Sequence, residues 1–196
     1  MPNWKTHLEV GKRFNKKFNF KDEDYNLFLL GNILPDINNC YIVKDISTKI
    51  SHSKTHFNNP DKPGYLMFYD KYQKYIEKSP LFLGCYIHLF TDYTWNNNFY
   101  TRIKGTKFED IDRDELRKIK QSDFRKYNNN FINNTIELKD IDRVVDEINL
   151  IDEISLTKED ITKVLEYLKN QQKDETLDYK FYISKELDDL LNKTMF

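Results

Sequence analysis

The chain of 196 residues is 39% hydrophobic and 32% charged, a balance that is typical of folded globular proteins and excludes a disordered chain. Its net charge of −1 lacks the basic excess that binding to phosphate backbones requires, so we expect no nucleic-acid partner. The two cysteines, Cys40 and Cys85, form neither a disulfide framework nor a CxxC metal site.

The sequence also indicates where in the cell the protein is located. Residues 1–7 contain no apolar signal core. The longest apolar runs have about ten residues, half of what a membrane-spanning helix needs. We therefore expect a cytoplasmic protein without a transmembrane segment, while the pattern leaves the oligomeric state open.

The N-terminal part of the chain is predicted to be helical. Residues 4–18 have an apolar stripe at helical spacing. This stripe consists of Trp4, His7, Leu8, Gly11, Phe14 and Phe18. A second helix begins at Asp22, where acidic residues suit the positive end of the helix dipole. It ends before Pro35, because the residue before a proline avoids the helical region.

Residues 37–61 are predicted to be irregular, and two helices follow them. Pro63 can begin a helix that includes Ile76, and Pro80 suits the first turn of a long central helix that runs to about Ile103. This central helix contains the most apolar segment of the chain. Residues three and four apart share one face of it. That face carries Leu81, Gly84, Cys85, His88, Thr91, Asp92 and Trp95.

The C-terminal half predicts three or four amphipathic helices, roughly at 110–129, 140–152, 157–171 and 175–193. This half contains no histidine and no cysteine. We therefore predict an all-α fold, a multi-helix bundle in which residues 1–196 form a single domain. Its metal-site half spans about 1–105, and its helical packing half spans about 106–196.

Histidines and acids in the first half are candidate metal ligands. His7 and His88 lie on apolar stripes, and Asp36 and Asp92 lie beside the most apolar runs. Taken singly, each histidine reads as a hydrogen-bonded core residue and each acid as a cap or paired side chain. Burying a carboxylate is unfavourable unless it is paired or binds a cation, and no lysine or arginine is near His88 and Asp92 in sequence. A zinc ion would satisfy the acids and imidazoles together.

Four segments, in chain order, resemble the zinc-dependent phospholipase C family, whose all-helical fold is shared with the single-strand-specific zinc nucleases. They are WKTHL at 4–8, GNILPD at 31–36, THFNNPD at 55–61 and LGCYIHLFTD at 83–92. The third is similar to the family's S-H-F-Y-D-P-D segment and the fourth to its L-G-x-x-x-H-x-x-x-D helix. The resemblance covers roughly residues 4–100.

The resemblance implies a set of metal ligands. By it, Asp36, His56, His88 and Asp92 hold one zinc ion, and Asp36 also serves as the base that orients water. In the secreted enzymes a second ion is held by the counterpart of His7, the other oxygen of Asp92 and the chain's amino terminus. Here Met1 lies only six residues before His7, so the amino-terminal ligand is not expected.

Departures from the family pattern imply a reduced metal centre. The first histidine of the third metal should fall ten residues after His88, where this sequence has Asn98, and no histidine follows His88. We therefore expect one zinc ion, with a second possible. His52, four residues before His56, is either a substitute ligand or a surface-loop histidine.

Two main functions follow from this reading. The first is a zinc-binding hydrolase-like protein with phospholipase C-type phosphodiesterase activity, in which metal-activated water attacks a small-molecule or lipid phosphodiester. The alternative is a non-catalytic helical protein with a structural zinc site, because four protein ligands close such a site. A metal-free helical domain with hydrogen-bonded core histidines is a third reading. The sequence leaves open whether the protein is an enzyme.

Overall fold

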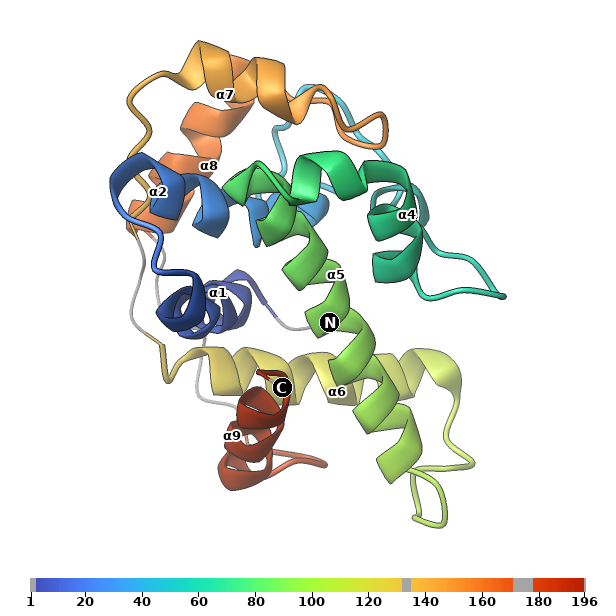
Figure 1. The fold of residues 1–196 in the computed structure, drawn as a ribbon. Helices are drawn as coiled ribbons and strands as arrows, with labels where there is room; N and C mark the ends of the chain where they lie inside the picture. Colours follow the sequence, from blue (N-terminus) through green and yellow to red (C-terminus); the bar gives the residue numbers. More distant parts are fainter. Residues whose placement is uncertain (1–2, 132–134, 171–177, 196) are drawn as a thin grey trace.

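The computed structural model describes residues 3–131, 135–170 and 178–195. The described part is built from helices and contains no strand (Figure 1), which confirms the predicted all-α class. The elements are, in chain order, α1 (Trp4–Phe18), α2 (Asp22–Gly31), the 3-10 helix η1 (Leu34–Asp36), α3 (His52–Thr55), α4 (Gly64–Ile76), α5 (Pro80–Arg102), α6 (Arg113–Asn128), α7 (Ile141–Ile148), α8 (Lys158–Asn170) and α9 (Ser184–Lys193).

Local capping explains where the first helices begin and end. The side chain of Asn3 accepts a hydrogen bond from the backbone N–H of Trp4 at 2.6 Å, and Asn19 ends α1 in the left-handed conformation with φ of 58°. α2 ends before Pro35, as predicted. The side chain of Ser79 caps α5 directly before Pro80, so this helix also begins where the sequence indicates.

Two segments differ from the sequence prediction. The stretch predicted to be irregular contains the one-turn helix α3, which the side chain of Ser51 caps. α9 begins at Ser184 rather than near residue 175; residues 175–177 lie outside the described part. The carboxylate of Asp123 accepts the backbone N–H groups of residues 180, 181 and 182 at 2.7, 2.9 and 2.8 Å. Because these three N–H groups bond to the side chain of Asp123, residues 180–182 stay outside α9, which begins at residue 184.

α5 crosses the molecule from the end formed by α7 and α8 to the end formed by α6 and α9 (Figure 1). It packs mainly against α2 and α4. Its first half joins one apolar cluster through Leu81 and Cys85, and its second half joins another through Trp95 and Phe99. Residues 88–92 therefore lie where the two clusters meet along α5.

Glycines allow α2 and α5 to approach closely. The backbones of Gly31 and Gly84 face each other, and a Cβ atom on either residue would lie 2.9 Å from the Cα atom of the other. A Cβ on Gly84 would also collide with the carbonyl oxygen of Phe28. The absence of a side chain at these two positions therefore permits the close contact between α2 and α5.

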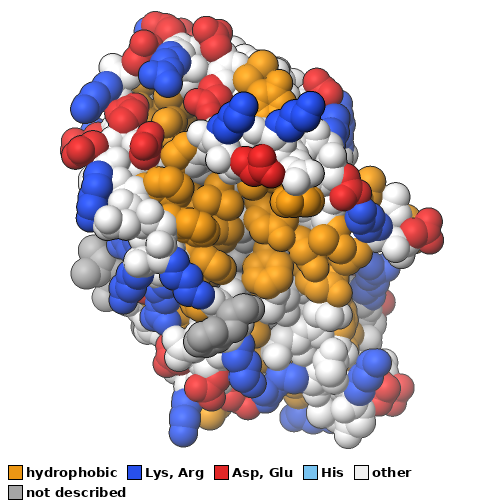
Figure 2. All heavy atoms as spheres, in the orientation of Figure 1, with side chains coloured by type: hydrophobic (Ala, Val, Ile, Leu, Met, Phe, Trp, Pro, Cys, Tyr) orange, Lys and Arg blue, Asp and Glu red, His pale blue; other side chains and the backbone are white. Residues whose placement is uncertain are grey.

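The surface combines apolar and charged side chains. Figure 2 shows apolar side chains gathered over the middle of one face, with lysine, arginine and acidic side chains around them. Within the described ranges, the structure contains no helix of sufficient length and apolar character to span a lipid bilayer.

Candidate metal centre

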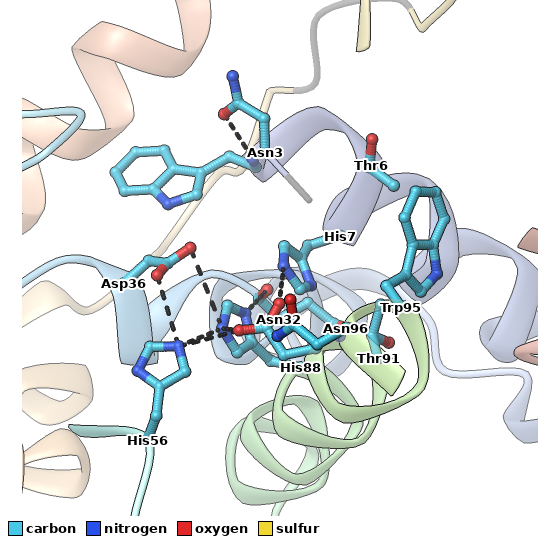
Figure 3. Close-up of polar contacts among 12 residues, drawn as sticks. Asn3, Thr6, His7, Asn32, Asp36, His56, His88, Thr91, Trp95 and Asn96 are labelled. Atoms are coloured by element: carbon cyan, nitrogen blue, oxygen red, sulfur yellow. Dashed lines mark hydrogen bonds and ion pairs between the residues drawn. The ribbon is translucent and has the colours of Figure 1, made fainter. Parts of the chain in front are cut away.

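Five side chains converge at one buried point of the fold (Figure 3). His7 comes from α1, Asp36 from η1 and His56 from the end of α3, while His88 and Asp92 lie one turn apart on α5. Each of the five exposes 5% or less of its surface. The structure therefore brings together all the residues that the sequence marked as candidate ligands.

The distances from His56 to the other side chains are close to those around a single ion, whereas the distances from His88 to the two carboxylates are longer. His56 Nε2 lies 3.2 Å from His88 Nε2, 3.2 Å from Asp92 Oδ2 and 3.5 Å from Asp36 Oδ1. His88 Nε2 lies 4.0 Å from Asp36 Oδ2 and 3.8 Å from Asp92 Oδ2. Ligand atoms about 2.0–2.2 Å from a tetrahedral ion are about 3.3–3.6 Å apart. His7 Nε2 lies 3.3 Å from Asp92 Oδ1, the other oxygen of that carboxylate.

Hydrogen bonds on the outer side of the rings assign their tautomers. His88 Nδ1 lies 2.8 Å from the backbone carbonyl oxygen of Asn32, and a carbonyl accepts only, so His88 Nδ1 carries the proton. The hydroxyl of Thr55 donates to the carbonyl of His52 at 3.3 Å. It therefore accepts from His56 Nδ1, 2.9 Å away. Both Nε2 atoms are then left with lone pairs that face each other.

Several buried polar atoms lack hydrogen-bond partners. Both carboxylate oxygens of Asp92 and both ring nitrogens of His7 are buried without a hydrogen bond in the described part of the chain. An uncompensated buried carboxylate is unfavourable by several kcal/mol. A cation among these lone pairs would remove that penalty, so the residues present fit a metal ion.

Burial raises the pKa of Asp36, whereas at His88 and Asp92 the electrostatic environment favours the protonation states that bind metals. Burial, with a further contribution from His7, lowers the pKa of His88 well below its ordinary value. Burial alone would raise the pKa of Asp92, but the imidazoles of His56 and His7, 3.2 and 3.3 Å from its oxygens, hold it well below its ordinary value. Neutral imidazole and ionised carboxylate are the ligand forms of these side chains.

Three overlapping groups of side chains could hold a metal ion, with ligand atoms within 4.8 Å of one another. Histidine and carboxylate donors suit zinc and also other first-row divalent metals. The groups are Asp36–His56–His88, His7–His88–Asp92 and His52–His56–Asp92.

His52 lies against this cluster rather than on an open loop. It begins α3, it is half-buried, and its ring stacks on that of His56 with centroids 3.6 Å apart. The spacing of four residues between the two histidines places them on one side of a helical turn. The sequence left His52 as either a substitute ligand or a surface-loop histidine, and the structure places it beside His56 in one of the candidate metal-binding groups.

The structure assigns Asn98 a contact away from the ligand cluster. Asn98 Oδ1 accepts a hydrogen bond from the Tyr182 hydroxyl at 2.9 Å. This bond ties α5 to the segment before α9. The side chain at the position of the family's third-metal histidine therefore joins two parts of the fold.

Outer hydrogen bonds orient the ligands, and the sequence reading did not identify them. Asn39 Nδ2 donates to Asp36 Oδ1 at 3.1 Å, while Thr55 and the carbonyl of Asn32 hold the two histidine rings. Partners of this kind fix ligand orientation in metal sites. Asn39 follows Asp36 by three residues, which is the only signal in the sequence that could have indicated its role.

Two clefts reach the cluster from different sides. One, with a volume of about 660 Å³, is lined by His56, Asp92, Asn96 and Tyr100 among other residues. The other, of about 430 Å³, reaches Asp36. Its lining includes three cations, Arg117, Lys118 and Arg125. A small molecule can therefore approach either carboxylate of the cluster.

The chain was compared with protein-family models, with curated proteins and with solved structures, and none of them matches. The family resemblance noted in the sequence thus rests on its four segments alone. The structure adds a buried histidine–aspartate cluster that could hold a metal ion.

Proposed function

We propose that this protein is a zinc-dependent hydrolase of phosphodiesters, similar in its chemistry to the zinc-dependent phospholipase C family. The observation that carries the proposal is the pair of facing Nε2 atoms of His56 and His88, 3.2 Å apart and flanked by Asp36 and Asp92. Two lone pairs at this distance repel each other unless a cation lies between them. Zinc bound there would supply a Lewis acid and would lower the pKa of water to about 7.

The residues of the cluster have separate roles in this proposal. His56, His88 and Asp92 would hold the ion, and His7, which contacts the second oxygen of Asp92, could hold another. Asp36 would be a further ligand and would orient the attacking water, since it lines a cleft and its Oδ1 accepts a hydrogen bond from the amide of Asn39. A general base must reach the proton that it removes, and Asp36 combines that access with its place in the cluster.

The charges around the clefts support an anionic substrate. Arg117, Lys118 and Arg125 line the cleft that reaches Asp36, and cations there would attract a negatively charged group. Both clefts, of about 660 and 430 Å³, lie in the range of small-molecule sites. A small-molecule or lipid phosphodiester combines the required charge and size.

One geometric feature favours a second candidate function, a structural zinc site. Asp36, His56, His88 and Asp92 already supply four protein ligands, and a closed tetrahedral site leaves no position for water. In this case the ion would tie η1, α3 and α5 together without catalysis. The two functions differ in whether water exchanges at the ion.

Metal analysis and hydrolysis, measured together, test the proposal. We expect untagged protein to contain at least equimolar zinc and to hydrolyse bis(p-nitrophenyl) phosphate, and we expect Asp92→Asn to lose both. Asp142→Asn removes the same charge from an exposed pair with Lys158 and should keep both.

The outcomes separate the candidate functions. Absence of zinc from the native protein would exclude both. Zinc without hydrolysis, and without exchangeable water at the ion, would select the structural site. Hydrolysis that survives in Asp92→Asn would show that the reaction occurs elsewhere.

A further inference from the structure

Lys120 is a buried cation that the metal chemistry does not use. It lies on α6 with 5% of its surface exposed. Its Nζ donates to Asn96 Oδ1 at 2.8 Å and lies 5.4 and 4.9 Å from the ring centroids of Phe99 and Tyr100. No carboxylate of the described residues forms an ion pair with it. A buried ammonium without a counterion is unfavourable, and such groups beside clefts are candidates for functional roles.

The ammonium of Lys120 determines how the amide of Asn96 is turned. An ammonium only donates hydrogen bonds, so Asn96 must direct its oxygen to Lys120 and its NH₂ group elsewhere. Asn96 lies one turn after Asp92 on α5, beside the histidine cluster in Figure 3, and lines the same cleft as Asp92 and His56. Within the described residues this NH₂ group donates no hydrogen bond. It is therefore free to donate to an acceptor in the cleft.

The charge balance of the site indicates what that acceptor is. One divalent ion with the carboxylates of Asp36 and Asp92 is neutral, and Lys120 then leaves one positive charge beside the cleft. Burial lowers the pKa of Lys120 to about 8, with Arg113 and Arg117 adding to the shift and Asp92 opposing it. The ammonium thus remains charged at neutral pH. A phosphodiester carries a single negative charge and complements it.

We propose that Asn96 and Lys120 form an anion subsite beside the metal centre. Asn96 donates a hydrogen bond from its amide to a non-bridging oxygen of the phosphodiester. Lys120 is a positioning residue, which fixes the amide and supplies the compensating charge. The identity of the anion rests on the proposed function, whereas the subsite itself rests on the geometry of Asn96 and Lys120.

Titration with inorganic phosphate, followed by calorimetry at pH 7 with and without added zinc, tests the subsite. We expect Lys120→Gln and Asn96→Asp each to weaken phosphate binding by about tenfold or more, the size of a lost charge-assisted hydrogen bond. Lys120→Arg should recover part of the affinity. Lys126→Gln is the matched control, because Lys126 lies on the same helix and pairs with Asp178; its affinity should stay within about twofold.

Circular dichroism confirms that every variant is folded. Each titration result then either supports or overturns the proposed subsite. Unchanged phosphate affinity in Lys120→Gln and Asn96→Asp, or wild-type protein that binds no phosphate in either state, overturns it. If the protein binds no zinc, the proposed function fails, and the titration without zinc still decides whether phosphate binding depends on Lys120. If phosphate binds through Lys120 but no diester is hydrolysed, the hydrolase proposal fails and the subsite stands.

Discussion

At the scale of single residues, the hydroxyl of Thr55 determines whether His56 can act as a metal ligand. Because it donates to the carbonyl of His52, it can only accept from His56 Nδ1, which leaves the Nε2 lone pair toward the cluster. The residue next to a ligand thus sets the tautomer of that ligand. Threonine has the β-branched shape of valine, so the hydroxyl can be removed at nearly constant volume.

Thr55→Val should weaken zinc binding by about 10–100-fold, the usual effect of removing an outer hydrogen-bond partner of a ligand. The measurement is competition with a zinc-binding dye. Thr162→Val removes an exposed hydroxyl that bonds to the carbonyl of Lys158 and should leave the affinity unchanged. Equal zinc affinity in the Thr55 variant and the wild type would contradict the assigned tautomer.

Lys120→Met should raise the free energy of unfolding of the metal-free protein at pH 7 by about 1–2 kcal/mol. The pKa of Lys120 falls from 10.5 to about 8 on folding, which is a penalty of about 3 kcal/mol. Loss of the hydrogen bond to Asn96 and of the two ring contacts offsets part of the gain. Urea denaturation measures the difference.

The pH dependence of this difference has a defined sign. Below pH 8 both the folded and the unfolded states hold the proton on Lys120, so the folded state carries the full penalty. Between about pH 8 and 10.5 the unfolded state binds more protons than the folded state, so wild-type stability rises with pH relative to Lys120→Met. A variant that is less stable than wild type at pH 7 would instead indicate a structural role for Lys120.

At the scale of the elements, the contact between α2 and α5 sets the geometry of the candidate metal centre. α5 carries His88 and Asp92, and the end of α2 leads to Asn32, whose carbonyl orients His88. The facing backbones of Gly31 and Gly84 allow these two elements to pack closely. The helix contact and the ligand orientation are therefore linked through one short stretch of backbone.

Gly84→Ala should destabilise the protein by about 3 kcal/mol and weaken zinc binding as well. The added Cβ would clash with the carbonyl oxygen of Phe28. Because this atom belongs to the backbone, it cannot rotate away as a flexible side chain can, so α2 must move away from α5. Thermal unfolding and dye competition measure the two effects. Thr101→Ala, at an exposed position of α5, is the control. Wild-type stability in the Gly84 variant would mean that the helices tolerate a wider separation.

At the scale of the whole molecule, the candidate centre joins elements that are far apart in the chain. His7 lies in α1, while Asp92 lies in the second half of α5, and their side chains are 3.3 Å apart. A metal ion at this position would bind only the folded chain. Zinc binding would therefore be coupled to global stability.

Zinc at 100 times its dissociation constant should stabilise the fold by about 2.7 kcal/mol. For a chain of this length that corresponds to a rise in Tm of about 5–10 °C. Calorimetry of the protein before and after chelation measures the shift. A Tm that does not respond to chelation would count against both proposed zinc functions.

Most of the helices and the candidate ligands could be predicted from the amino-acid sequence, whereas α3 and the start of α9 could not. Helical periodicity, prolines and capping residues are local properties, so the prediction that α1 spans 4–18 and that α5 begins at Pro80 is confirmed. The pairing of His88 with Asp92 was also predictable, because a spacing of four residues on one helix places them together. The identity of the metal ion stays a prediction.

Only the tertiary structure decided what surrounds that pair. His7, Asp36 and His56 reach α5 through packing between distant segments, and distances of that kind do not follow from local spacing. The start of α9 depends on Asp123, more than fifty residues earlier. The burial of Lys120 against α5 likewise follows from the docking of α6. These contacts arise from long-range packing, which periodicity cannot encode.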